Sequence, residues 1–159
     1  MKYKYLFIFV LFLGLSVNAY AQSGEVSSVL KAFRITLDAD SNEVATEVTE
    51  VKPGDIIEYR LTYQNGTGGD ISQLKPVLPI PLEMFYLEDT ASPVLSGASI
   101  SPIANDFRQP PLTRQVTLPD GSQVNRVIPA QEYRRLQWLV PALAAGESVT
   151  LTARVEVRS

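Results

Sequence analysis

The sequence predicts an all-β fold: a β-sandwich of seven to eight strands with Greek-key connections and little or no helix. Three observations indicate this. Apolar and polar residues alternate in several segments, turn-forming residues separate those segments, and no stretch shows capped helical spacing. Alternation with a period of two places the two sets of side chains on opposite faces of a strand. Short strands at regular spacing are typical of sandwiches.

The first predicted strands lie near the start of the globular part. In residues 33–37, Phe33, Ile35 and Leu37 share one face of an extended segment. A polar turn then leads into a second predicted strand, residues 44–51. Aspartate, serine and asparagine occupy this turn, and all three favour turn conformations. The sequence therefore predicts two neighbouring strands here.

The clearest alternation lies in two longer segments. In residues 56–64 the apolar positions are every second residue from Ile57 to Tyr63. In residues 148–158 they run in the same way from Val149 to Val157. Both patterns are those of half-buried strands with one face on a core.

A hairpin is predicted between residues 115–118 and 123–128. Its turn contains Pro119 and Gly121, which stand at the second and fourth positions favoured in a type I turn. A further strand is predicted around 135–140, and residues 141–145 have the composition of one helical turn at most.

The first 21 residues have the layout of a secretory signal peptide. Basic residues precede an apolar run, and Ala19 and Ala21 supply the small residues of an A-x-A-like cleavage site. The apolar run is shorter than the roughly 20 residues that span a bilayer. We expect cleavage after Ala21, no stable membrane span afterwards, a short segment 22–28 and one domain over 29–159. The expected location is periplasmic or secreted.

Three motifs resemble a known domain family. Residues 51–65 contain Pro-Gly-Asp followed by alternating apolar positions and a terminal Asn65, residues 78–81 read Leu-Pro-Ile-Pro, and Trp138 precedes the segment 143–151. Together they resemble the conserved-repeat domain of bacterial and archaeal surface proteins. The resemblance implies an Ig-like sandwich, in a family whose biochemical role is mostly undefined.

Composition excludes several kinds of chemistry. The chain has no Cys and no His, and its formal net charge is −3. It therefore has no disulfide framework, no thiol nucleophile and no Ser-His-Asp triad. A mildly acidic protein is also a poor match for nucleic acid phosphates. We expect a protein that is not an enzyme, takes no cofactor and binds no nucleic acid.

One weak calcium candidate is present. Asp38, Asp40 and Asn42 place oxygen ligands on alternate residues, as in the first half of a calcium loop. Glu43 stands where that loop requires glycine. Because these residues are also good turn formers, the alternative is a metal-free turn.

Charge is unevenly distributed along the chain. Residues 36–58 carry seven acids and one Lys, whereas residues 108–135 carry five Arg and two acids. Opposite patches of this kind suit envelope partner proteins or head-to-tail self-association, and the alternative is two solvated faces. The candidate interaction residues are Phe107, Arg108, Arg114, Arg126, Arg134 and Arg135.

These observations predict a secreted, non-enzymatic structural or protein-interaction module of the bacterial cell envelope. The alternative is a periplasmic or extracellular binding module for glycan or polypeptide. That module would use an open sheet edge or residues 91–111, a long segment with little pattern whose Phe107 and Arg108 are expected to be exposed anchors.

Overall fold

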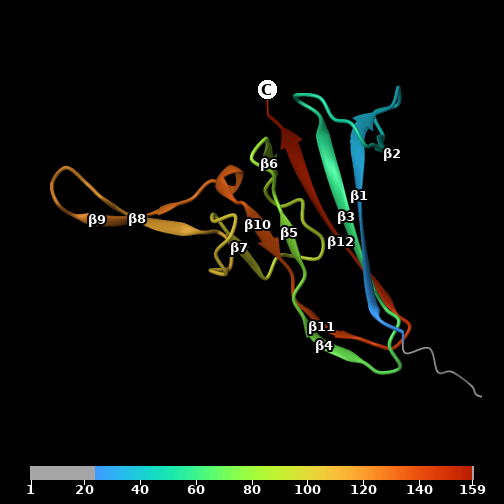
Figure 1. Ribbon diagram of the computed structural model, residues 1–159. Helices are drawn as coiled ribbons and strands as arrows, with labels where there is room; N and C mark the ends of the chain where they lie inside the picture. The colour runs from blue at the N-terminus through green and yellow to red at the C-terminus, as the bar shows by residue number, and fades with distance from the viewer. Residues whose placement is uncertain (1–23, 159) are drawn as a thin grey trace, which may run out of the picture.

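The computed structural model describes residues 24–158 and confirms the all-β prediction (Figure 1). The predicted signal peptide and its cleavage site lie outside the described residues. In the described part, regular structure consists of strands and one 3₁₀ turn, η1 (Ala130–Glu132), and no helix is long and apolar enough to cross a membrane. The strands are β1 (Val26–Leu37), β2 (Glu43–Glu47), β3 (Ile56–Asn65), β4 (Ile71–Leu74), β5 (Val77–Pro79), β6 (Met84–Tyr86), β7 (Gly97–Ser99), β8 (Thr113–Thr117), β9 (Gln123–Val127), β10 (Arg135–Gln137), β11 (Val140–Leu143) and β12 (Ser148–Val157).

The described strands form two main layers. One is a five-stranded sheet in the order β2-β1-β3-β12-β6, and the other is a three-stranded sheet in the order β5-β10-β7. Two separate pairs, β11-β4 and β8-β9, extend from the second layer (Figure 1). The strands outnumber the seven or eight predicted because several have only three or four residues, too few to show a period.

Strands β3 and β12 form the centre of the large sheet. Their register places Leu61 opposite Leu151 and Ile57 opposite Val155, and all four side chains are buried. The alternation predicted for both segments is therefore confirmed. Each of these side chains contributes roughly 1.5–3 kcal/mol by leaving water.

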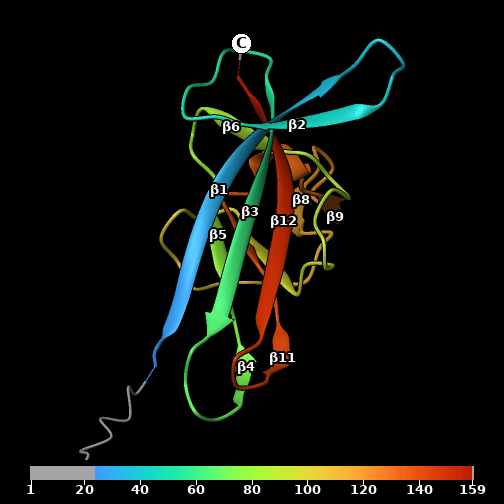
Figure 2. The ribbon, with the colours of Figure 1, turned by 90° about the vertical axis from the view of Figure 1, so that its right-hand side faces the viewer.

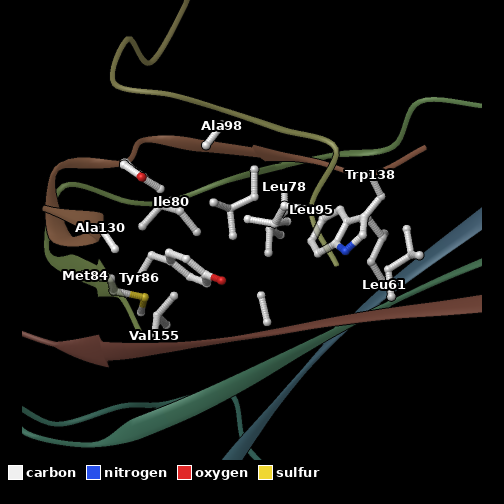
Figure 3. Packing of buried hydrophobic residues seen from close by; sticks show 14 of the residues in the cluster. Leu61, Leu78, Ile80, Met84, Tyr86, Leu95, Ala98, Ala130, Trp138 and Val155 are labelled. Atoms are coloured by element: carbon white, nitrogen blue, oxygen red, sulfur yellow. The ribbon is translucent and has the colours of Figure 1, made fainter. Parts of the chain in front are cut away.

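The core fills the space between the two layers. Figure 3 shows Leu78 and Ala98 on one side of it, and Leu61 and Val155 on the other. Trp138 is almost completely buried in this core, and its indole nitrogen donates a hydrogen bond to the carbonyl of Pro93 at 2.8 Å. The indole thereby satisfies its single polar group inside the core.

Strand β1 departs from the prediction in one respect. Phe33 does share a face with Ile35, but that face is the outer one, where the Arg60 guanidinium lies 4.1 Å from the centre of the Phe33 ring. The opposite face of β1 carries Leu30, which is paired with Leu61. Leu30 is nevertheless about half exposed, at 49%. The second layer covers the middle of the large sheet and leaves this part of β1 in solvent.

The end of β3 is tied to neighbouring loops by Asn65. Its fully buried side-chain nitrogen donates to the carbonyls of Gly69 and Leu143, at 2.8 and 2.9 Å. Its side-chain oxygen accepts from the backbone nitrogen and the hydroxyl of Thr67. The Asn that ends the Pro-Gly-Asp motif therefore holds the β3–β4 loop against β11. Although Asn65-Gly66-Thr67 fits a glycosylation sequon, its amide is enclosed.

The turn residues predict the hairpin correctly, and the alanine-rich segment that follows is part of a strand. The predicted hairpin is confirmed as β8 and β9, with Gly121 donating to the carbonyl of Leu118 at 2.9 Å. Residues 141–145, whose composition allows one helical turn at most, form no helix. Residues up to Leu143 belong to β11, which pairs with β4. Pairing with a strand distant in sequence overrides the local preference of an alanine-rich segment.

Candidate functional site

The most prominent surface feature is the ribbon formed by β8 and β9, called here the arginine ribbon (residues 113–127). It extends away from both layers, and its strands pair only with each other (Figure 1). Most of its side chains are exposed. At its base Leu112 and Ile128 are buried, and the Ile128 nitrogen donates to the Leu112 carbonyl at 2.8 Å. The ribbon is therefore anchored to the core but contributes little to it.

Two arginines stand directly opposite each other on this ribbon. The register pairs Arg114 with Arg126. Arg114 also forms a salt bridge of 2.5 Å with Glu132, the last residue of η1. Like charges at directly opposed positions destabilise a strand pair. This face of the ribbon is consequently a site where a negatively charged group would relieve repulsion.

The other predicted arginines lie elsewhere and are bound within the molecule. Arg134 donates to the carbonyls of Met84 and Gln131, at 3.1 and 3.2 Å. Arg135 donates to the carbonyl of Ala104 at 2.9 Å. Both guanidinium groups hold loops in place, so the structure separates them from the pair on the arginine ribbon.

Residues 91–111 are more ordered than their sequence indicates. They contain β7, which pairs with β10, and Arg108 exchanges two main-chain hydrogen bonds with Ala98, at 2.8 and 3.0 Å. The Arg135 guanidinium lies 4.8 Å from the centre of the Phe107 ring, which is half-buried. The expectation that Phe107 is an exposed anchor is therefore wrong, because a side chain from β10 covers its ring. The exposed Arg108 guanidinium reaches the carbonyl of Thr113 at 3.2 Å.

Both ends of this segment border a cleft of about 430 Å³. The stacked rings of Tyr86 and Tyr133 lie beneath it, with centroids 6.1 Å apart, and burial raises the pKa of Tyr86. The remaining lining residues are Glu88, Asp89, Ala91, Val94, Leu95, Gln109, Pro110 and Pro111. Sequence reasoning identified the segment, but the acidic side of the cleft comes from the loop that precedes it.

The acidic stretch 36–58 is largely neutralised within the molecule. Four of its seven acids form salt bridges with basic residues outside the stretch: Glu43 and Glu58 with Arg154, Glu47 with Lys31, and Asp55 with Arg34. The charge expected for the acidic patch is thus reduced by pairing that the linear sequence does not reveal.

Glu58 is the most enclosed of these acids. Burial raises the pKa of its carboxyl, but hydrogen bonds from Arg60 and Arg154 outweigh burial, so this pKa lies below its ordinary value. The pKa of Glu43 is also lowered, chiefly by its hydrogen bonds with Arg154. Arg154 therefore bridges β12, β3 and the start of β2 on the outer face of the large sheet.

The calcium candidate is an internally bonded turn. One Asp38 carboxylate oxygen accepts hydrogen bonds from the backbone nitrogens of Asp40 and Asn42, both at 2.9 Å. The bond from the Asn42 backbone is the main cause of a lowered pKa at Asp38. Within residues 24–158 no group of three or more acidic side chains is arranged to hold a metal ion. The oxygen of Asp38 thus stabilises the β1–β2 turn, as turn-forming aspartates do.

Comparison of the chain with protein-family models, with curated proteins and with solved structures finds no match. The resemblance to the conserved-repeat domain therefore stays a prediction from the sequence motifs. Function has to be inferred from the surfaces described above.

Proposed function

We propose that this protein is a non-enzymatic protein-interaction module of the bacterial cell envelope, and that it contacts an acidic partner protein through the arginine ribbon. The observation that carries the proposal is the ribbon itself, a projecting strand pair that holds Arg114 opposite Arg126. The envelope location rests on the predicted signal peptide.

Such a ribbon adds little to the stability of the fold. A two-stranded ribbon is marginally stable in water, and opposed arginines weaken it further. Because most of its side chains are exposed, they contribute little to the hydrophobic core. A carboxylate-rich partner surface would neutralise Arg126 and place a second acid beside Arg114, which Glu132 already contacts at 2.5 Å. Charge complementarity of this kind supplies specificity and rapid association.

Head-to-tail self-association is a less favourable use of this surface. The stretch that would receive the ribbon, residues 36–58, already has four of its seven acids in intramolecular salt bridges. A separate partner with unpaired acids is the better match.

The test is crosslinking in cells followed by mass spectrometry of the proteins captured with the chain. Arg126→Ala is compared with Asn125→Asp, which changes the net charge equally but lies on the opposite face of the same strand. We expect Arg126→Ala to reduce capture of a defined envelope partner several-fold, and Asn125→Asp to leave it unchanged. Equal capture by wild type and Arg126→Ala, or recovery of the wild type as an uncrosslinked monomer, would exclude the ribbon as the contact.

The cleft beside residues 91–111 favours a second candidate function, a binding module for glycan or polypeptide. Its volume of about 430 Å³ lies within the range of ligand sites, and it combines an apolar wall with Glu88, Asp89 and Gln109. Leu95→Trp would fill the cleft. If the cleft is the site, this variant should lose the thermal stabilisation that a glycan or peptide from a screen gives to the wild type.

A further inference from the structure

The N-terminal half of β1 is an open edge of the large sheet. Residues Val26–Lys31 pair with β3 on one side, whereas β2 pairs only with residues from Phe33 to Leu37 on the other. Figure 2 shows this half of β1 as the outermost strand, with β2 turned away at the far end. Among the described residues, none pairs with the outer side of this half.

The direction of the main-chain groups follows from two hydrogen bonds. The carbonyl of Ala32 accepts from the Val48 nitrogen, on the β2 side, at 2.9 Å. The carbonyl of Glu25 accepts from the Gly66 nitrogen, on the β3 side, at 3.1 Å. Because alternate residues of an antiparallel strand direct both main-chain groups to the same side, Ser28 and Leu30 present theirs to the open edge.

The side chains along this edge are unusually apolar for an exposed strand. Val26, Val29 and Leu30 are all exposed, and they occupy both faces of the strand. Sheet edges in soluble proteins are normally protected by charges, prolines or bulges. Here Lys31 supplies the single charge between Val26 and Ala32, and it already contacts Glu47 at 3.0 Å.

We propose that this edge pairs with the same edge of a second copy of the chain, antiparallel and centred on Ser28. This register places Val26 opposite Leu30 of the second copy, and Ser27 opposite Val29. It also places Glu25 opposite Lys31, so that an acid faces a base on the same side of the sheet. Since the interface has two-fold symmetry, each of these contacts occurs twice.

The register centred on the next residue, Val29, fits less well. Centring the pair on Val29 would require main-chain groups of Ala32, whose carbonyl is bound to Val48. It would also place Glu25 opposite Phe33, and the charge pair would be lost. The register centred on Ser28 uses only main-chain groups that have no partner among residues 24–158, and it makes about six main-chain hydrogen bonds. The large sheet then continues through both copies.

This dimer is independent of the arginine ribbon, which lies on another part of the molecule. The paired edge is short, and small interfaces are typically weak and transient. We therefore expect a concentration-dependent monomer–dimer equilibrium of the full chain in analytical ultracentrifugation. A monomer at every concentration tested would overturn the proposal. It would leave a strand from another protein as the occupant to seek.

Because the chain contains no Cys, a single introduced cysteine reports the register directly. In the proposed dimer the two Ser28 Cα atoms lie about 5.5 Å apart, within disulfide range. The two Ser27 Cα atoms are offset by two residues along the strands, or about 8 Å apart, which is too far for a disulfide. Ser28→Cys should thus form a disulfide-linked dimer on mild oxidation, and the matched control Ser27→Cys should not. Equal crosslinking of both variants would contradict the register.

A charge exchange tests the same register in a second way. Lys31→Glu places acids opposite each other twice per dimer and should weaken dimerisation by about fivefold to tenfold. Adding Glu25→Lys should restore most of the lost affinity, because the pairs return with reversed sign. Failure of the double variant to recover, while its melting temperature matches that of the single variant, would overturn the assignment of this pair.

Discussion

Replacing Asn65 with alanine should lower the free energy of unfolding by about 2–4 kcal/mol. The side chain makes four hydrogen bonds, two donated to carbonyls and two accepted from Thr67. Thr67 and Gly69 lie near the surface, so water can replace much of what they lose. The Leu143 carbonyl is enclosed, and leaving it without a partner costs about 1–3 kcal/mol by itself. Loss of the other bonds accounts for the rest.

The assay is chemical denaturation at neutral pH, with Asn125→Ala as the control. Asn125 lies exposed on the arginine ribbon, so the same chemical change should stay within about 0.5 kcal/mol of wild type. For a domain of this size, the Asn65 variant should also melt about 6–14 °C lower. A loss below 1 kcal/mol for Asn65→Ala would refute the claim that this amide joins the two loops.

Three further predictions concern single residues. Glu58→Gln should make the free energy of unfolding less dependent on pH between pH 6 and pH 2, as measured by denaturation across this range. The carboxyl's folded-state pKa is lowered by its two arginine partners, so its contribution is present above its unfolded pKa of 4.5 and is lost as the pH falls through the folded-state value. Gly146→Ala should cost about 1–2 kcal/mol in a thermal melt because its φ is +78°, whereas Gly68→Ala should be nearly neutral. Trp138→Phe should cost about 1–3 kcal/mol in urea, since the Pro93 carbonyl loses its donor.

The sequence predicted those elements whose signal is local. Strand β3 was expected over 56–64 and is found at Ile56–Asn65, because nine residues of alternation identify both a strand and its buried face. The β8–β9 hairpin followed from its turn residues. Strands β5, β6 and β7 were not expected, since three residues show no period. They exist because β10 and β12 offer them partners.

The candidate site was predictable to a smaller extent, for a related reason. A turn fixes which residues of a hairpin face each other. The pairing of Arg114 with Arg126 was therefore predictable from the sequence. The partial burial of Phe107 was not predictable, because Arg135, which covers its ring, is distant in sequence. The same holds for the acids that Arg154 neutralises and for the exposure of Leu30, which depends on where the second layer ends.

Stability and the proposed contacts reside in different parts of the molecule, and this separation makes the binding experiments interpretable. The core lies between β3 and β12 on one side and β5, β7 and β10 on the other. Arg126 and Ser28 are both exposed, so substitutions there remove no buried contact. Surface changes of this kind usually alter stability by less than about 0.5 kcal/mol. A variant at either position that loses its partner while its melting temperature is unchanged therefore reports on the contact itself.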